Sequence, residues 1–292
     1  MLNAMTLPWQ TWVVLTGIVG LLVGSFLNVV IYRLPRMMER QWRADCESLT
    51  AGVEAKPLSP YNLAVPRSAC PHCQTPIRAT DNLPVLSWLL LRGCCRACRG
   101  AISIRYPLVE LVTAILSIAV VWRFGATWEA LCGLALTWAL ICLTVIDFDT
   151  QLLPDQITLP LLWLGLLAAR CLGRGPAALP VDIDSAVVGA MAGYLSLWLV
   201  FQGFKAATGK EGMGRGDFKL LAALGAWLGW QLLLPILLFS AGAGAIWGIA
   251  LIALKRHDRE QPIPFGPYLA VAGWLIMMWS QPLTASWWPL TR

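Results

Sequence analysis

Long apolar stretches recur along the 292-residue chain, and they constrain its fold more than any other feature. A stretch of about 20 apolar residues is long enough to cross a bilayer as one helix. The segment 220–254 is too long for a single span, and Gly229, Trp230 and Gln231 offer a tight break, so we expect two helices from it. The other apolar stretches cover residues 9–32, 106–122, 128–146, 157–169, 185–204 and 268–288. The sequence therefore predicts an all-α polytopic membrane protein with about eight transmembrane helices.

The composition excludes several other classes of protein. Hydrophobic residues make up 58% of the chain, charged residues make up 13%, and the mean hydropathy is +0.64. Soluble domains carry about twice that share of charge, so ordinary cytosolic enzymes, disordered chains and fibrous repeats are excluded. No Lys or Arg precedes the first apolar stretch, which is also too long for the core of a signal peptide. We expect this stretch to be a retained span.

Basic residues are unevenly distributed between the expected loops. The polar segment 33–105 contains 11 of the 22 Lys and Arg residues, and the loops 205–219 and 255–259 contain seven more. The basic residues expected on the opposite side are Arg123, Arg170, Arg174 and Arg292. Because loops rich in Lys and Arg stay in the cytoplasm, we expect segment 33–105 to be cytoplasmic and both termini to lie outside. We attribute the net charge of +6 to the orientation of the protein in the membrane. We therefore expect the lipid bilayer as a partner and no nucleic acid.

Four cysteines in the segment 33–105 have the spacing of a zinc site. They form two C-x2-C pairs about 20 residues apart, a pattern typical of tetrahedral zinc, and they are Cys70, Cys73, Cys95 and Cys98. Cys94 adjoins the second pair without sharing its spacing, and His72 is an alternative ligand inside the first turn. Disulfides or free thiols are the other interpretation, which a reducing cytoplasm disfavours. A closed four-sulfur set leaves no open position for catalysis, so we expect a structural zinc in a small loop domain.

Two aspartates at the edges of apolar stretches are candidates for catalysis. Asp147 ends the third stretch and Asp217 opens the sixth, so both are expected at the cytoplasmic edge. Two close carboxyl groups share one proton, and such a pair can activate water and polarise a carbonyl, as in aspartic proteases. Gly214 and Gly216 would let a substrate backbone approach closely. The alternatives are that Asp217 only caps its helix and that Asp149 is a solvated loop residue.

Several motifs in order resemble the type IV prepilin peptidases, which cleave leaders and N-methylate the product. Residues 214–217 read Gly-Arg-Gly-Asp, similar to the GxGD signature of this class of aspartyl protease. The other matching segments are 24–35, the cysteine loop, 105–110, 146–155 and 264–268. The resemblance implies Asp147 and Asp217 as catalytic residues, since the family places its first aspartate seven residues before a proline, here Pro154. It also implies zinc at the four cysteines.

The resemblance implies further properties. S-adenosylmethionine would be the methyl donor, and the substrates would be type IV prepilins and type II secretion pseudopilins at a bacterial inner membrane. Methyl transfer rests on the resemblance alone, because segment 33–105 contains no glycine-rich turn of the soluble methyltransferase kind. Gly93, Asn28 and Glu110 are candidates for it. For Asn28 a bond to a neighbouring helix is the alternative, and for Glu110 a pair with Arg33 or Arg105.

A basic leader would also need a place to bind. The segment 147–156 contains acidic residues and no Lys or Arg, and Glu211 lies near the second aspartate. We therefore expect Asp149 and Glu211 to attract the cations of the leader. The predicted domains are a first span at 1–32, a cytoplasmic zinc-binding loop domain at 33–105 and a transmembrane peptidase domain with the aspartate pair at 106–292.

Two other functions use intramembrane carboxylates. Presenilin-like or signal-peptide-peptidase-like proteases share the GxGD signature, but they lack a cysteine loop of this kind. A proton-coupled transporter would place its charges near the middle of its spans and show half-helix repeats. Here the aspartates lie at the ends of apolar stretches and no repeat is evident, which favours a membrane-edge peptidase.

Overall fold

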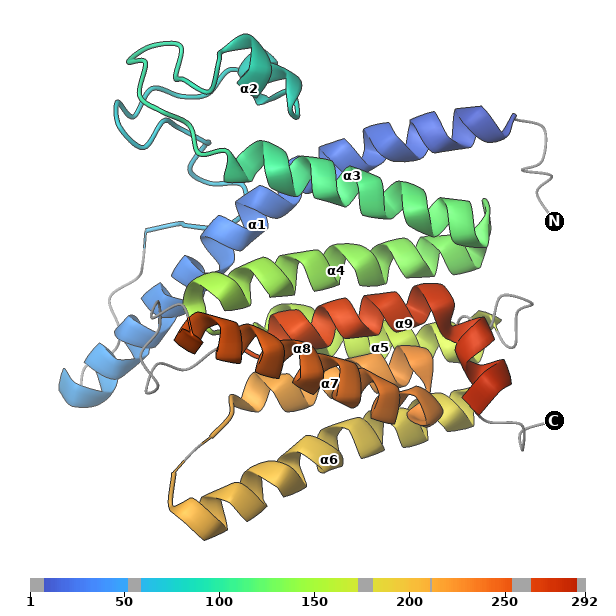
Figure 1. The fold of residues 1–292 in the computed structure, drawn as a ribbon. Coiled ribbons are helices and arrows are strands. Elements are labelled where there is room, and N and C mark those ends of the chain that lie inside the picture. The colour runs from blue at the N-terminus through green and yellow to red at the C-terminus, as the bar shows by residue number, and fades with distance from the viewer. Residues whose placement is uncertain (1–7, 52–58, 173–180, 211, 254–263, 288–292) are drawn as a thin grey trace. The chain divides into compact units, whose positions relative to one another are not determined.

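A computed structural model describes residues 8–51, 59–172, 181–210, 212–253 and 264–287, and these residues are mainly helical (Figure 1). The longer helices are α1 (Trp9–Ala51), α3 (Arg105–Phe124), α4 (Trp128–Thr150), α5 (Asp155–Leu172), α6 (Ile183–Thr208), α7 (Arg215–Leu228), α8 (Leu233–Ala253) and α9 (Gly266–Trp287). The short elements are α2 (Leu86–Leu90) and the 3-10 turns η2 (Ala79–Asn82) and η3 (Trp230–Leu232). Strand pairing in the described ranges is limited to two isolated bridges in the cysteine loop.

The chain divides into two compact units, Met1–Trp122 and Arg123–Arg292. In the first unit, α1 and α3 pack with their backbones close together. A Cβ atom at Gly20 would lie 2.6 Å from Ala114 Cα, and one at Gly24 would lie 2.7 Å from Glu110 Cα. Glycines four residues apart share one face of a helix, and in membranes such small faces let helices approach closely. This contact fixes α1 beside the first half of α3.

Helix α1 continues well beyond the apolar stretch from which it was predicted. The apolar residues end near Tyr32, whereas the helix runs through Pro35 to Ala51. The extension contains several Arg, Met and Glu residues, which are good helix formers, so the helix continues beyond the end of the apolar stretch. Arg33, at the junction, is buried and donates hydrogen bonds to the carbonyls of Asn62 (2.9 Å) and Pro66 (2.7 Å). The start of the cysteine loop is thereby held against α1.

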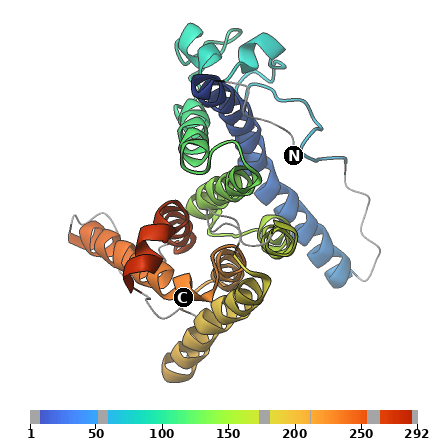
Figure 2. The same cartoon turned by 90° about the vertical axis from the view of Figure 1, so that its right-hand side faces the viewer.

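Helix α7 is the buried centre of the second unit. Every residue from Asp217 to Leu228 is buried except Lys219, whose side chain is 31% exposed. Helix α7 contacts α5, α6, α8 and α9. Glycines allow the closest approach, since a Cβ at Gly189 of α6 would lie 2.3 Å from the carbonyl oxygen of Gly225. Figure 2 shows α6 and α7, in gold and orange, side by side. The predicted break after α7 is confirmed, because Gly229 ends that helix with φ +83° and η3 follows.

The helices support a multi-pass membrane protein but do not settle the number of spans. Six helices in the described ranges are long and apolar enough to cross a bilayer, and they belong to α1, α3, α4, α5, α6 and α8. Helix α7 has 14 residues, and the shorter apolar segment of α9 is Gly266–Trp279. The predicted total of eight spans, like the division at residues 32 and 105, stays a prediction.

Candidate active site and metal centre

The two predicted catalytic aspartates lie at helix ends in the second unit, and both are buried. Asp147 is 4% exposed in the last turn of α4, and Asp217 is 6% exposed in the first turn of α7. Helix α4 ends because Gln151 adopts a left-handed conformation, and its N–H bonds the carbonyl of Asp147 at 2.9 Å. The two carboxyl groups are close enough for the charge of Asp147 to act on Asp217. The structure thus brings together two residues that are 70 positions apart in the sequence.

Leu153 joins the segments around the aspartates. A Cβ at Gly216, beside Asp217, would lie 2.7 Å from Leu153 Cβ, and one at Gly266 would lie 3.2 Å from Leu153 Cδ1. The same Cβ at Gly266 would lie 2.6 Å from Oδ2 of Asp147. The starts of α7 and α9 therefore meet at Leu153, just after α4, and the carboxyl group of Asp147 lies against the start of α9.

The carboxyl groups differ in their surroundings. Oδ2 of Asp147 is buried and has no hydrogen-bond partner among the described residues. A Cβ at Gly214 would lie 3.6 Å from Oδ2 of Asp217, so this side of Asp217 faces a residue without a side chain. Phe218, the next residue, is buried edge-on against Tyr194 (5.9 Å) and Phe201 (5.6 Å) and anchors the start of α7 to α6. The arrangement can share a proton between two carboxyl groups and hold a water against them.

The acidic residues near the aspartate pair differ in exposure and in pairing. Asp149 is exposed at the end of α4, which fits both leader binding and a solvated residue, and Glu211 lies outside the described residues. The acidic segment carries less free charge than its sequence indicates, because both carboxylate oxygens of Asp155 bind Lys219 Nζ at 2.7 Å. This ion pair links α5 to α7.

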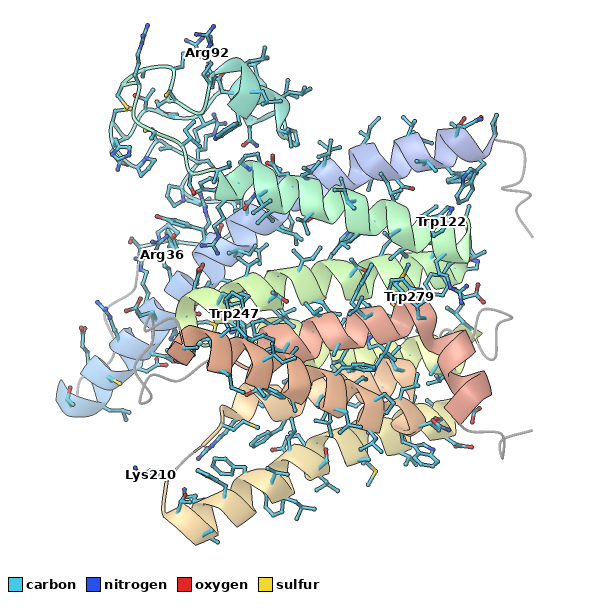
Figure 3. The ribbon with its side chains drawn as sticks, in the orientation of Figure 1. Arg36, Arg92, Trp122, Lys210, Trp247 and Trp279 are labelled. Atoms are coloured by element: carbon cyan, nitrogen blue, oxygen red, sulfur yellow. The ribbon has the colours of Figure 1, made fainter. Side chains whose placement is uncertain are left out.

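Sequence reasoning assigned no role to Gly266 or to Lys219. The signal for Gly266 was its place between two prolines at the start of a helix, in the segment 264–268. Lys219 gave no local signal, since its partner Asp155 is 64 residues away. Lys210, another basic residue, lies just after the end of α6 (Figure 3).

The four predicted zinc ligands form one cluster in the first unit. The sulfurs of Cys70, Cys73, Cys95 and Cys98 all lie within 4.8 Å of one another. The Sγ atoms of Cys70 and Cys98 are 3.8 Å apart, and those of Cys73 and Cys95 are 4.0 Å apart. Four sulfurs at about 2.3 Å from a tetrahedral zinc are about 3.8 Å apart. The donor set therefore fits zinc, and the cluster contains neither Cys94 nor His72.

The two C-x2-C turns have the same backbone geometry. Gln74 and Arg99 follow the second cysteine of each turn with φ 57° and 56°, and their N–H groups bond the carbonyls of Cys70 and Cys95. Hydrogen bonds from Thr75 lower the pKa of the Cys73 thiol to about 6. Backbone N–H groups of Cys98 and Ala97 likewise lower the pKa of the Cys95 thiol. One cysteine of each turn is thereby held closer to the thiolate form that binds metal. Burial and hydrogen bonds to the other cysteines instead raise the pKa of the Cys98 thiol to about 11.

The three residues considered for methyl transfer surround α2 and the start of α3. Asn28 of α1 donates to the carbonyl of Tyr106 at 3.0 Å, so it does bond a neighbouring helix. Glu110 accepts a hydrogen bond from the N–H of Val85 at 2.7 Å, just before α2. Gly93 follows α2 with φ +69°, and a Cβ there would lie 3.0 Å from the ring of Trp88.

Known proteins resemble this chain over nearly its whole length. Residues 18–124 match the bacterial peptidase A24 N-terminal domain, and residues 134–249 match the type IV leader peptidase family. A protein of Aeromonas hydrophila is 55% identical over 287 residues, covering 98% of this chain and 96% of its own length. Proteins of Pseudomonas aeruginosa and Neisseria gonorrhoeae are 52% and 48% identical, covering 94% of this chain and 93% of each relative. All three are named prepilin leader peptidase/N-methyltransferase. No solved structure matches the chain.

Proposed function

Because the chain belongs to the type IV leader peptidase family, we propose that it removes the basic leader of type IV prepilins and N-methylates the new N-terminus. The chain is an enzyme of the multi-pass membrane class. The proposed site of cleavage is the cytoplasmic edge of a bacterial inner membrane, with both termini of the chain on the periplasmic side. Pseudopilins of type II secretion are proposed as further substrates. The observation that carries the peptidase assignment is the buried carboxyl pair at the joined ends of α4 and α7.

Asp147 and Asp217 are the proposed catalytic residues. The ionised member of the pair takes a proton from a water molecule, and the resulting hydroxide attacks the scissile carbonyl. The protonated member donates its proton to the carbonyl oxygen. Collapse of the tetrahedral intermediate breaks the C–N bond, and the departing nitrogen takes a proton from the pair. The products are the leader with a new carboxyl terminus and the mature chain with a free amine.

Glycines beside the carboxyl groups make room for the substrate backbone. Gly214 faces Oδ2 of Asp217, where any side chain would narrow the approach. Next to this segment, Val200, Phe201, Phe204, Gly212 and Met213 line a cavity of about 180 Å³. An apolar side chain at the start of the mature pilin would fit this lining. The leader, which carries positive charge, would then pass Asp149 at the exposed end of α4.

Zinc is proposed at the four cysteines, where it would cross-link the two turns of the loop. S-adenosylmethionine is the proposed methyl donor and supplies the methyl group to the freed amine. Glu110 and Gly93 are proposed to shape the methyl-transfer region through α2, because one lies at each end of that helix. Asn28 is proposed to hold the start of α3 in place beside them.

The purified protein in lipid nanodiscs should be incubated with a prepilin, with and without S-adenosylmethionine. Mass spectrometry would measure loss of the leader and gain of a methyl group separately. We expect leader loss in both reactions and a mass gain of one methyl group only with the donor. An intact prepilin with the folded wild-type protein would contradict the peptidase assignment, and cleavage without methylation would contradict the second activity alone.

A further inference from the structure

Four leucines around α2 are exposed although they belong to an otherwise polar loop. Leu83, Leu86, Leu89 and Leu90 are 48%, 59%, 58% and 81% exposed. The last three are spaced i, i+3 and i+4 and therefore share one face of the short helix. Exposing several neighbouring leucines to water is unfavourable, and a patch of this kind marks a surface that meets an apolar partner.

The aromatic residue of α2 points the other way. Trp88 donates its indole N–H to the carbonyl of Ile102 at 3.1 Å, and its ring covers Gly93. The loop thus folds around Trp88 and leaves the leucines outside.

The backbone before α2 is strained, and a buried carboxylate holds it. Val85 has φ 58° and ψ −47°, a conformation that β-branched residues rarely adopt. The N–H of Leu86 bonds the carbonyl of Pro84 across this turn, and the N–H of Val85 bonds Glu110 Oε2 at 2.7 Å. Strain of this kind persists only where surrounding contacts enforce it. Glu110 therefore fixes where α2 begins.

The position of Glu110 sets the level of α2 relative to the bilayer. Helix α3 has 20 residues, enough to cross the hydrocarbon region, and begins at Arg105. At 1.5 Å per residue, Glu110 lies about 7.5 Å along the helix axis from Arg105. Interfacial segments bury their apolar face about 5–10 Å into the boundary between headgroups and acyl chains. Leu108, on the same turns of α3, is also 56% exposed, as expected at a lipid-facing level.

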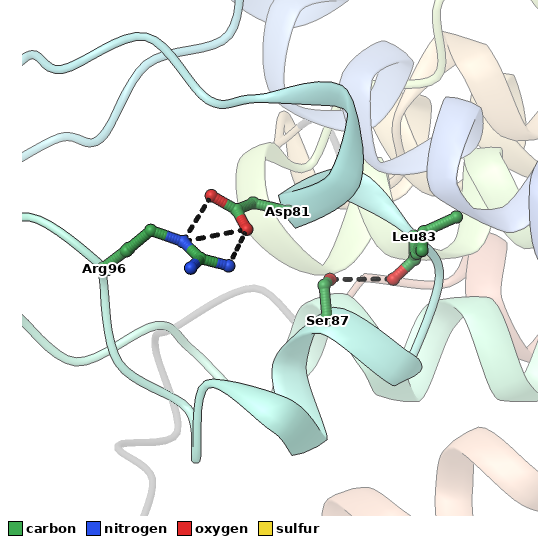
Figure 4. A network of polar contacts seen from close by, with 4 residues as sticks. All are labelled: Asp81, Leu83, Ser87 and Arg96. Atoms are coloured by element: carbon green, nitrogen blue, oxygen red, sulfur yellow. Dashed lines mark hydrogen bonds and ion pairs between the residues drawn. The ribbon is translucent and has the colours of Figure 1, made fainter.

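The polar side of the loop completes an amphipathic arrangement. Arg96 binds Asp81 through Nε and Nη2 at 3.1 Å and 2.6 Å, and Ser87 donates to the carbonyl of Leu83 at 2.7 Å (Figure 4). These contacts occupy polar groups of the loop within the loop itself. Arg92, just after α2, is exposed and extends from the loop in Figure 3. An arginine at the border of a leucine face is suited to lipid phosphates.

We propose that the segment 83–90, held by Glu110, is a lipid-binding element whose leucines insert into the membrane interface beside the start of α3. The partner is the lipid surface of the bilayer in which the protein resides. The loop with the cysteine cluster would then be attached to the membrane at two places, at α3 and at α2.

The test compares two leucines of the first unit that are almost equally exposed. A fluorescent amino acid is incorporated at Leu90 (81% exposed) and, in a separate protein, at Leu49 (83% exposed). Leu49 lies on the polar extension of α1, about 25 Å along the helix axis from Tyr32. Both full-length proteins are placed in nanodiscs that contain phospholipids with nitroxide groups near the headgroup or deep in the chain. Iodide is the water-soluble quencher.

We expect shallow nitroxides to quench the Leu90 label at least about three times more than the Leu49 label, with iodide showing the opposite order. Deep nitroxides should quench Leu90 less than shallow ones do. Equal quenching of the two labels by lipid nitroxides would overturn the proposal. Protection of the Leu90 label from both lipid and iodide quenchers would also overturn it, because protein and not lipid would then cover the leucines.

Discussion

Gly266 and Asp147 are in contact although 119 residues separate them in the sequence: a Cβ at Gly266 would lie 2.6 Å from Oδ2 of Asp147. No real Cβ is tolerated at that distance, so the first residue of α9 has to lack a side chain for the carboxyl group to keep its place. The contact makes the start of α9 part of the wall around the proposed catalytic pair.

We therefore predict that Gly266→Ala lowers kcat for leader cleavage by about 100-fold, because displacing a catalytic group by about 1 Å can cost that much. Steady-state cleavage of a prepilin measures the effect. Gly242→Ala is the matched control, since a Cβ at Gly242 of α8 meets nothing within 4 Å. Equal activity of the two variants would show that Asp147 can move without loss.

The carboxyl pair itself is tested by isosteric substitution. Asp147→Asn and Asp217→Asn should each lower cleavage by at least about 100-fold, because neither amide can exchange a proton with water or substrate. Asp149 is exposed and lies two positions after Asp147, and Asp149→Asn should retain cleavage. Methylation of a substrate that has already been cleaved should survive in all three variants. A dead Asp149 variant beside an active Asp147 variant would reverse the assignment.

Substitution of single cysteines should distinguish the zinc ligands from Cys94. Cys70→Ser or Cys98→Ser should reduce bound zinc, measured by elemental analysis, from about one per chain to near zero and lower the Tm. Cys94→Ser should retain zinc, because Cys94 lies outside the cluster of four sulfurs. Acid should release the metal from the wild type, since the ligands bind as thiolates. Retention of zinc by the Cys98 variant would contradict the four-sulfur site.

Leader recognition should depend weakly on the exposed charge of Asp149. Asp149→Asn should raise KM for a prepilin roughly two- to fivefold with little change in kcat, since exposed ion pairs contribute under about 1 kcal/mol. Added salt should raise KM of the wild type in the same way. Asp155→Asn is the comparison, because Asp155 is already paired with Lys219. An unchanged KM for Asp149→Asn at low ionic strength would rule out this contribution.

The hydrogen bond between Glu110 and Val85 should matter for methylation more than for cleavage. Glu110→Ala removes an acceptor with formal charge, whose hydrogen bond is worth about 1.5–3 kcal/mol, and should lower the methylation rate about tenfold or more. Cleavage by the same variant should stay within about twofold of the wild type. Glu39→Ala is the control, since Glu39 is exposed and pairs with Arg43 on the surface of α1. Loss of cleavage and methylation together would instead indicate general destabilisation.

The sequence by itself determined the features that depend on local pattern. Apolar stretches of span length predicted the long helices, because hydropathy is a local property of the sequence. Gly229 predicted the break after α7, because a glycine with positive φ ends a helix locally. The spacing of two C-x2-C pairs selected Cys95 over Cys94, since each turn positions its sulfurs locally, and the cluster of sulfurs agrees. The position of Asp147 and Asp217 at helix ends was expected from their place at the ends of apolar stretches.

Tertiary structure decided which distant residues meet. Asp155 looked like part of an acidic patch, yet Lys219 neutralises it from another helix. Glu110 also accepts a hydrogen bond from the N–H of Val85, 25 residues away, a contact that no sequence pattern predicted. Sequence pattern reports which face of a helix is apolar, whereas the partner of each polar group depends on how helices approach one another. That approach is set by glycine contacts such as Gly24 against α3 and Gly266 against Asp147, which no local pattern contains.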